Sequence, residues 1–253
     1  GLCVAGQTGE LAPADKALYS LRDATSTVES IPLIASSIMS KKLAAGAQCI
    51  VLDVKCGSGA FMKTEEQARQ LAQEMVRIGR GAGRRVSALI TNMDIPLGYA
   101  IGNALEVIEA AEILRGRGDQ ALTRLCVALS AQMMALSAQG SIAFYEKKAE
   151  AALQDGSAFQ KLRELVRAQG GDDSVLEHPE RFPQAKVKMP VLSPESGFII
   201  HMDAELIGRA AMLLGAGRVE KEGAIDPAAG IVLRKKTGDF VHRGETVAQL
   251  FTN

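Results

Sequence analysis

The sequence predicts an α/β fold, with a mostly parallel or mixed sheet flanked by helices, on three observations. Two continuous apolar runs, 49–54 and 86–90, have the character of strands buried on both faces. The segment between them repeats apolar residues at helical spacing, which indicates a right-handed strand–helix–strand crossover. From residue 183 onward, short strands punctuated by glycine and proline replace the long helices.

Composition limits the class of function. The 253 residues carry 29 Lys plus Arg and 29 Asp plus Glu, so the net charge of zero gives no reason to expect a nucleic-acid or anionic-membrane partner. The apolar share of 47% excludes general disorder, and the aromatic share of 4% supplies few rings for stacking on bases. No run of about 20 apolar residues, the length that a membrane helix needs, is apparent.

The cysteines and histidines are scattered along the chain. No two cysteines form a Cys-x-x-Cys pair, so the spacing predicts neither a zinc site nor a disulfide framework. We expect buried, reduced thiols in a cytoplasmic protein. The residues concerned are Cys3, Cys49, Cys56, Cys126, His178, His201 and His242.

The first 46 residues predict a strand and two helices. An apolar run over 2–5 ends in a glycine-rich turn, and a helix begins near Asp15, after Pro13. Ser30 offers an N-cap for a strongly apolar helix over 31–45, which Gly46 ends. The chain opens within an apparent strand and without an initiator Met, so we expect a further stretch upstream.

The middle of the chain predicts one capped helix and three further helices. Thr64 begins a helix with an acidic first turn, whose apolar residues repeat every three or four positions. Further helices are predicted over 103–115, 122–136 and 144–153. We expect an apolar stripe on the second of these to pack in the core; it comprises Leu122, Leu125, Leu129, Met133 and Leu136.

The C-terminal region predicts a separate α+β subdomain. Strands are expected over 187–191, 198–201, 231–233 and 247–251, with a helix over 203–214 among them. The segment from Gly230 to Glu245 resembles the hairpins of lipoyl-like (barrel-sandwich) modules. The predicted organisation is therefore a strand and turn over 1–13, a short all-α segment over 14–45, an α/β domain over 46–182 and this subdomain over 183–253.

Two groups of residues are candidates for chemistry. Ser37 and Lys41 are four residues apart and share one helix face, and with Arg22 they offer a hydroxyl and two cations to a planar, oxygen-rich ring. The alternative is a helix face that is simply solvated. The glycine loop over 57–59 follows a buried strand, where open parallel sheets bind ligands. On spacing alone, however, an ion pair of Asp53 with Lys55 that holds this loop is favoured over a ligand site.

Three long blocks of sequence, 11–42, 51–63 and 96–107, resemble in order the thymidine and pyrimidine-nucleoside phosphorylases, and the stretches 213–218 and 230–233 extend the resemblance. Such enzymes use phosphate to split a pyrimidine nucleoside, such as thymidine, uridine or deoxyuridine, reversibly into the free base and a (deoxy)ribose 1-phosphate. The resemblance implies phosphate as co-substrate, no organic cofactor, and a homodimer formed through a small all-α domain. Alternatives are a non-catalytic pyrimidine-binding paralogue and a lipoyl-like carrier module.

The resemblance also implies which residues form the site. Lys41 and Arg22 would stabilise charge on the departing base and Ser37 would orient it. The full set of base-binding residues is Tyr19, Arg22, Ser37 and Lys41, with an apolar wall of Val28, Ile34, Ile38 and Phe61. A potassium-like cation would be held by the carbonyls of Leu97 and Ala100 and the carboxylate of Glu109. As an alternative, Glu109 is an ordinary exposed helix residue.

The phosphate-binding loop of such enzymes lies upstream of the blocks matched here. We therefore expect these 253 residues to be the C-terminal portion of a phosphorylase, with the base half of the site and without the phosphate half. Because phosphate would then be neither bound nor oriented, we expect the chain alone to be inactive.

Overall fold

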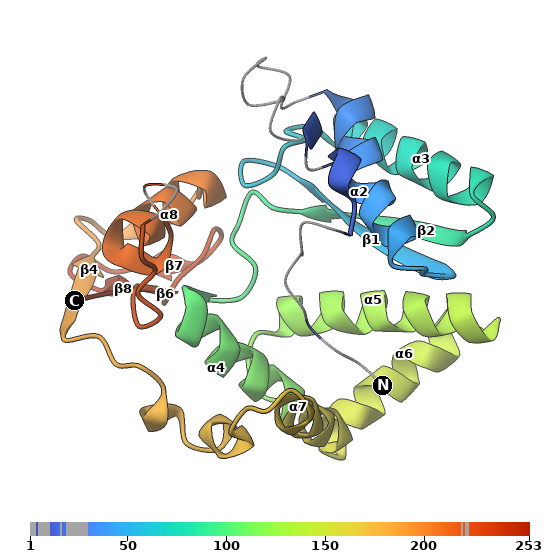
Figure 1. The fold of residues 1–253 in the computed structure, drawn as a ribbon. Helices are drawn as coiled ribbons and strands as arrows, with labels where there is room; N and C mark the ends of the chain where they lie inside the picture. Colours follow the sequence, from blue (N-terminus) through green and yellow to red (C-terminus); the bar gives the residue numbers. More distant parts are fainter. Residues whose placement is uncertain (1–3, 5–10, 16, 19–29, 219, 221–222) are drawn as a thin grey trace. The chain divides into compact units, whose positions relative to one another are not determined.

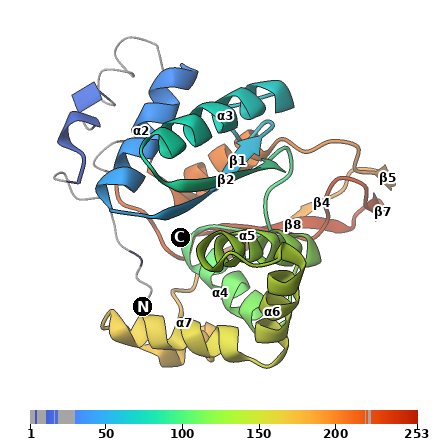
Figure 2. The same cartoon turned by 90° about the vertical axis from the view of Figure 1, so that its right-hand side faces the viewer.

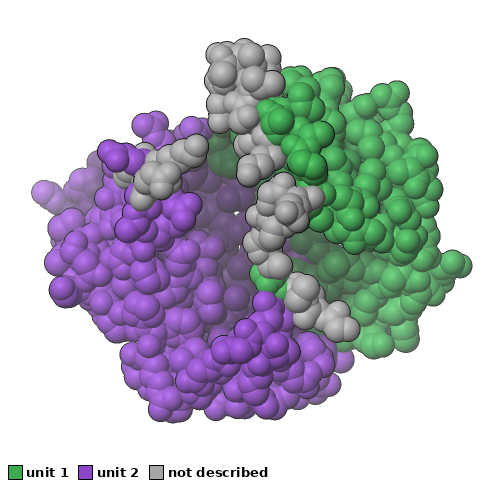
Figure 3. Space-filling view, viewed as in Figure 1, with its two compact units in different colours: residues 1–92, 126–149 green, residues 93–125, 150–253 purple. Residues whose placement is uncertain are grey.

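The computed structural model describes residues 4, 11–15, 17–18, 30–218, 220 and 223–253 (Figure 1). Contacts between Cα atoms divide the chain into two compact units (Figure 3). Unit 1 comprises residues 1–92 and 126–149, and unit 2 comprises residues 93–125 and 150–253. Each unit contains a hydrophobic cluster of its own. Both units combine helices with strands, so the structure is of the α/β class, as predicted.

The sheet of unit 1 is a parallel pair. Strands β1 (Cys49–Cys56) and β2 (Arg85–Asn92) run in register from one end to the other. Helix α3 (Glu65–Gly81) joins them, which confirms the predicted crossover. Alternate residues of β1, namely Ile50, Leu52 and Val54, are buried in the core of this unit.

The capped start of α3 is also confirmed. The Thr64 hydroxyl accepts a hydrogen bond from the Gln67 amide, and the Gln67 side chain accepts one from the Thr64 amide. These two bonds form a capping box and satisfy two amides that the first turn leaves without helical partners.

Helix α2 (Ile31–Ala44) packs on α3 through its buried face. Ile34, Ala35 and Met39 are at most 2% exposed. A Cβ placed on Gly79 of α3 would lie 2.4 Å from Val86 Cγ2 and 3.0 Å from Met39 Cε, so only glycine allows this close approach. Ser30 holds the N-cap position as predicted, but its side chain makes no capping hydrogen bond.

Helix α5 (Gln120–Ala138) meets the other side of the sheet within unit 1. Ser87 Oγ donates to Gln132 Oε1 at 3.4 Å, and Cys49 Sγ donates to the Leu136 carbonyl at 3.7 Å. Its buried residues are Val127 and Ala131. The predicted apolar stripe is therefore wrong as the core face, because its member Met133 is 52% exposed.

By length and mean hydropathy, α5 qualifies as a membrane-spanning segment among the described residues. It does so although no uninterrupted apolar run exists, because Arg124 is its only charged residue and alanine, leucine and methionine dominate. One such helix is weak grounds for a membrane location, since core helices of soluble proteins meet the same criteria. Helix α6 (Ile142–Gln154) follows it.

In unit 2, α4 (Asn103–Leu114) packs against α7 (Ser157–Ala168), as Figure 2 shows. Helix α7 was not predicted. Two short 3-10 helices follow, Asp173–Leu176 and Pro179–Arg181. Arg163 of α7 pairs with Asp173 at 2.6 Å, and Arg115 donates to the Leu176 carbonyl at 2.9 Å. These contacts fix α7 and the first 3-10 helix to the end of α4.

The C-terminal part of unit 2 is antiparallel. One sheet has the order β3-β6-β8-β4, from β3 (Ala100–Ile101), β6 (Gly230–Leu233), β8 (Thr246–Thr252) and β4 (Val187–Leu192). A second pairs β5 (Gly197–Phe198) with β7 (Phe240–Val241). Helix α8 (Ala204–Ala211) continues into a π-helical turn over Met212–Ala216.

Two details of this part differ from expectation. The strand predicted over 198–201 is shorter, since only 197–198 pair. Strand β3 comes from residues 100–101, far before the C-terminal region, and pairs with β6. The loop that leads into α4 is thereby tied to the C-terminal sheet. This tie positions the loop that carries Leu97 and Ala100.

Candidate functional site

Unit 1 contains a cluster of a serine, a lysine and an aspartate. The Lys41 ammonium donates to Ser37 Oγ at 3.2 Å and lies 3.2 Å from Asp15 Oδ2. Ser37 is 6% exposed and the Asp15 side chain 8% exposed, whereas Lys41 remains 28% exposed. The cluster therefore consists of two buried oxygen-bearing side chains, Ser37 and Asp15, and an ammonium that reaches the surface.

Local sequence explains half of this arrangement. Ser37 and Lys41 lie four residues apart in α2, so the helix alone brings their side chains to one face, as predicted. Asp15 comes from the helical residues 13–15 and 17–18, which precede α2 in the chain. Sequence reasoning missed Asp15 because no periodic pattern links it to Lys41. A lone aspartate in an early helix carries no signal of its partner.

The other predicted base-site residues are placed as follows. Ile34 is 2% exposed and lies in the hydrophobic cluster of unit 1, and Ile38 packs against that cluster. Phe61 is 57% exposed in the loop after β1, next to the buried Met62. Tyr19, Arg22 and Val28 lie outside the described residues. The structure thus brings Ser37 and Lys41 together and turns Ile34 into the core.

The carboxyl ends of β1 and β2 carry a second polar cluster. Lys55 Nζ lies 2.5 Å from Asp53 Oδ2, and Thr91 Oγ1 donates to Asp53 Oδ1 at 2.5 Å. The predicted ion pair is confirmed. Nearby Cys126 is exposed, contrary to the expectation of buried thiols, and burial of its sulfur still raises the pKa of the thiol. Cys49 and Cys56 are partly buried, and all three are free thiols.

In unit 2, a backbone loop encloses the Glu109 carboxylate. Glu109 Oε1 accepts from the Tyr99 amide at 2.6 Å, and Oε2 accepts from the Ala100 amide at 3.3 Å. Gly98 has a φ of +65°, and a Cβ on it would lie 2.1 Å from Glu109 Oε2. Glu109 therefore binds the loop that carries Leu97 and Ala100, and is not an ordinary solvated helix residue.

Lys236 reaches the same loop from the C-terminal sheet region. Its ammonium donates to the Pro96 carbonyl at 3.0 Å and lies 4.3 Å from the centre of the Tyr99 ring. Burial lowers the pKa of Lys236, while the carboxylates of Asp119, Glu109 and Asp239 act in the opposite direction. Burial and the same three carboxylates raise the pKa of the Tyr99 hydroxyl.

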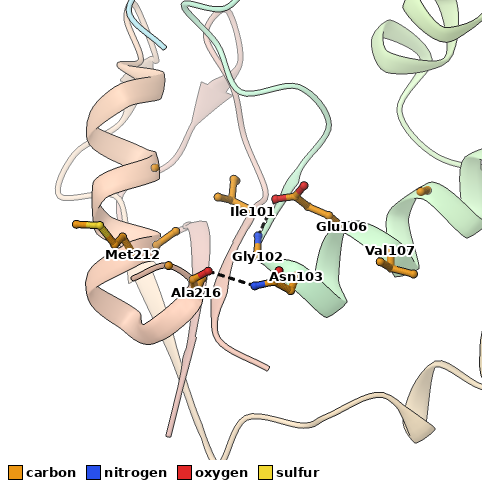
Figure 4. A pocket seen from close by; sticks show the side chains of 11 residues that line it. Ile101, Gly102, Asn103, Glu106, Val107, Met212 and Ala216 are labelled. Atoms are coloured by element: carbon orange, nitrogen blue, oxygen red, sulfur yellow. Dashed lines mark hydrogen bonds between the residues drawn. The ribbon is translucent and has the colours of Figure 1, made fainter. Parts of the chain in front are cut away.

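A cavity of about 460 Å³ lies beside the start of α4, within unit 2 (Figure 4). Glu106 Oε1 accepts from the Gly102 amide at 3.0 Å, and Asn103 Nδ2 donates to the Ala216 carbonyl at 3.2 Å, so both polar side chains have partners in the protein (Figure 4). The Glu106 carboxylate occupies the helix start, where an anion would otherwise be favoured. The cavity therefore shows no anion-binding chemistry.

Three lysines of the C-terminal region, Lys188, Lys235 and Lys236, are candidates for the modified lysine of a carrier module, and each has a contact within the protein. Lys235 Nζ lies 2.8 Å from Glu245 Oε1, and Lys236 is held as described above. Lys188 lies on β4 with its ammonium 5.7 Å from the Phe251 ring centre. None of the three sits at the tip of a hairpin, which is where a carrier displays its modified lysine. Across the described ranges, no group of three or more His, Cys, Asp or Glu residues is placed to hold a metal ion.

Comparison with known proteins places the chain in a family. Residues 1–159 match the model of the glycosyl transferase family, a/b domain, and residues 198–253 match that of the pyrimidine nucleoside phosphorylase C-terminal domain. The chain belongs to the pyrimidine-nucleoside phosphorylase family.

Several bacterial proteins are similar to this family member. All 253 residues align with pyrimidine-nucleoside phosphorylases of Bacillus subtilis (strain 168) at 52% identity and of Geobacillus stearothermophilus at 51% identity. An alignment of 254 positions with the Staphylococcus aureus (strain USA300) phosphorylase also shows 51% identity. In each case the chain spans 58% of the length of the relative. The family resemblance read from the sequence is confirmed.

Proposed function

We propose that this protein is a pentosyltransferase, a pyrimidine-nucleoside phosphorylase that converts thymidine, uridine or deoxyuridine and phosphate reversibly into the free base and (deoxy)ribose 1-phosphate. The observation that carries the proposal is identity of 51–52% over the whole chain to phosphorylases of that name. The cluster of Lys41, Ser37 and Asp15 supports it, because Ser37 and Asp15 hold the Lys41 ammonium where it remains partly exposed.

The chemistry requires stabilisation of a leaving base. A phosphate oxygen bonds to the anomeric carbon of the sugar while the bond from that carbon to the pyrimidine nitrogen breaks. The electron pair of the broken bond stays on the base, which departs as an anion and then takes up a proton. Lys41 and Arg22 would hold the negative charge on the base oxygens, and the Ser37 hydroxyl would set its orientation. The apolar wall would comprise Val28, Ile34, Ile38 and Phe61, with Ile34 at its buried side, and Tyr19 would bind the base.

The Glu109 loop is the proposed cation site. Potassium prefers hard oxygen ligands, and the carbonyls of Leu97 and Ala100 with the Glu109 carboxylate are of that kind. The carboxylate has acceptor capacity beyond the two amides it already binds, so the residues fit such an ion. A bound ion would neutralise charge and stiffen the loop.

The cation proposal is tested by thermal unfolding in KCl against NaCl at equal ionic strength. We expect a higher midpoint in KCl, and loss of the difference in Glu109→Gln. Glu65→Gln is the control, since Glu65 forms an exposed pair with Arg69 and does not touch the loop. Equal midpoints in both salts for the unsubstituted protein would contradict the site.

Three further features belong to the proposal. We place the protein in the cytoplasm as a homodimer, in keeping with a soluble metabolic enzyme. We also propose that the C-terminal region is a lipoyl-like barrel-sandwich module, in keeping with its antiparallel pairings. An unmodified mass of the purified protein would separate this structural role from a carrier function.

Phosphate-dependent release of thymine and uracil from thymidine and uridine tests the activity. Both the 253-residue chain and the product of the complete reading frame that contains it should be assayed. We expect release by the complete product, and a fall in kcat/KM of about 100- to 1,000-fold in Lys41→Ala.

Lys42→Ala is the matched control, because it removes the same charge from the next position of α2. We expect it to change kcat/KM by less than about twofold. Equal losses in the two variants would indicate a general effect of charge, and an unchanged Lys41→Ala would contradict the role of Lys41.

A further inference from the structure

We propose that Asp15 is a positioning residue for base recognition: its buried carboxylate fixes the Lys41 ammonium against Ser37, in the orientation that meets the pyrimidine. The inference rests on the proposed phosphorolysis. It adds a residue to the site that the sequence pattern of α2 does not indicate.

The burial of Asp15 is the first observation. Its side chain is 8% exposed, and an ionised carboxylate taken out of water is costly unless a cation or several donors compensate it. Lys41 Nζ at 3.2 Å supplies that cation. The two charges therefore depend on each other, and moving the ammonium away would remove the cation that compensates this carboxylate among the described residues.

The second argument concerns the flexibility of the Lys41 side chain. Its four-carbon stem adopts many rotamers, so an unheld ammonium spreads over many positions. The Ser37 hydroxyl is only 6% exposed and restrains Lys41 at 3.2 Å, but it is neutral. A second, charged acceptor on a different segment restricts the ammonium from another direction. Together the two acceptors restrict the ammonium more than either would alone.

The third argument concerns the two segments that carry the three side chains. Ser37 and Lys41 belong to α2, whereas Asp15 lies among the helical residues that precede it. The position of the Lys41 ammonium therefore depends on where the helical residues around Asp15 lie relative to α2. Misplacement of a catalytic group by about 1 Å can cost about 100-fold in rate, so such a link has a measurable consequence.

Steady-state kinetics of the complete reading-frame product test the proposal. In Asp15→Asn, which keeps the shape and removes the charge, we expect kcat for thymidine or uridine to fall about 10- to 100-fold. We expect the KM for phosphate to stay within about twofold, because Asp15 acts on the base side. A purely structural role would instead lower the melting temperature and leave the kcat of the folded protein unchanged.

Combining substitutions separates positioning from an independent effect. If Asp15 acts through Lys41, adding Asp15→Asn to Lys41→Ala should lower kcat by less than about twofold further. An undiminished 10- to 100-fold loss in that background would overturn the proposal. Asp15→Glu keeps the charge but moves it by one methylene, and we expect a kcat loss of at least about threefold, which again disappears with Lys41→Ala.

Failure of this inference and failure of the proposed function give different results. A fully active Lys41→Ala contradicts the role of Lys41 itself. An impaired Lys41→Ala together with a fully active Asp15→Asn overturns only the positioning role. If Asp15→Asn does not fold, Asp15→Glu decides, and a kcat equal to that of the unsubstituted protein overturns the proposal. Glu65→Gln, which removes an exposed pair with Arg69, is the matched control and should leave kcat unchanged.

Discussion

The cluster of Ser37, Lys41 and Asp15 in unit 1 and the Glu109 loop of unit 2 hold charged groups in opposite ways. In the first, a lysine is fixed by two side-chain oxygens, those of Ser37 and Asp15. In the second, a glutamate is fixed by two backbone amides, those of Tyr99 and Ala100. One arrangement depends on which side chains are present, and the other depends on the path of the backbone.

This difference predicts different sensitivities. A side-chain cluster fails when its charge or hydroxyl is removed, while the helices that carry it remain folded. A backbone cradle fails when the loop conformation changes, even if every polar side chain is retained. Substitution of the neutral Ser37 in α2 should therefore affect catalysis more than stability, and substitutions in the loop should affect stability first.

The largest expected effect is that of Gly98→Val. The residue has a φ of +65°, and the new Cβ would lie 2.1 Å from Glu109 Oε2. Backbone strain and overlap together should lower the free energy of unfolding by about 2–4 kcal/mol, measured by urea denaturation. Gly81→Ala is the control, since nothing lies within 4 Å of that position and its φ is ordinary, and it should be neutral or slightly stabilising. Equal stability of both variants would show that the loop is not shaped around Glu109.

Ser37→Ala should have a smaller and mainly catalytic effect. It removes the hydroxyl that accepts from Lys41 and leaves α2 intact, so we expect kcat/KM for the nucleoside to fall about 5- to 20-fold. The exposed Ser36, whose hydroxyl donates to the Leu33 carbonyl on the same helix, provides the control variant Ser36→Ala. Identical kinetics of the two variants would remove Ser37 from the base site.

The smallest expected effect concerns the pH dependence at Lys236. Burial lowers its pKa in the folded protein, so the unfolded chain binds more protons as the pH approaches the ordinary value of 10.5. Folding stability from this group therefore rises with pH in the window between the lowered pKa and 10.5. Urea midpoints measured through this window should rise more steeply for the unsubstituted protein than for Lys236→Met. Parallel curves would indicate that Lys236 is not desolvated against Tyr99 and Pro96.

Local features of the fold were predictable because few neighbouring residues encode them. The crossover over 49–92 followed from apolar periodicity, and the Thr64 cap followed from residue types three positions apart. The buried face of α5 was not predictable, because its apolar residues surround much of the helix. Tertiary packing, not the regular stripe, leaves Val127 and Ala131 covered and Met133 exposed.

The sequence by itself determined the fold class, the helix face that unites Ser37 with Lys41, and the resemblance that names the family. Only the tertiary structure decided that Asp15 compensates Lys41, that backbone amides enclose Glu109, and that Lys236 bonds to the Pro96 carbonyl. The physical reason is that helical spacing fixes neighbours within one turn, whereas an ion pair between distant segments is fixed by how those segments pack. The sequence around a charged residue does not indicate its partner in an ion pair, because only the packing brings the two together.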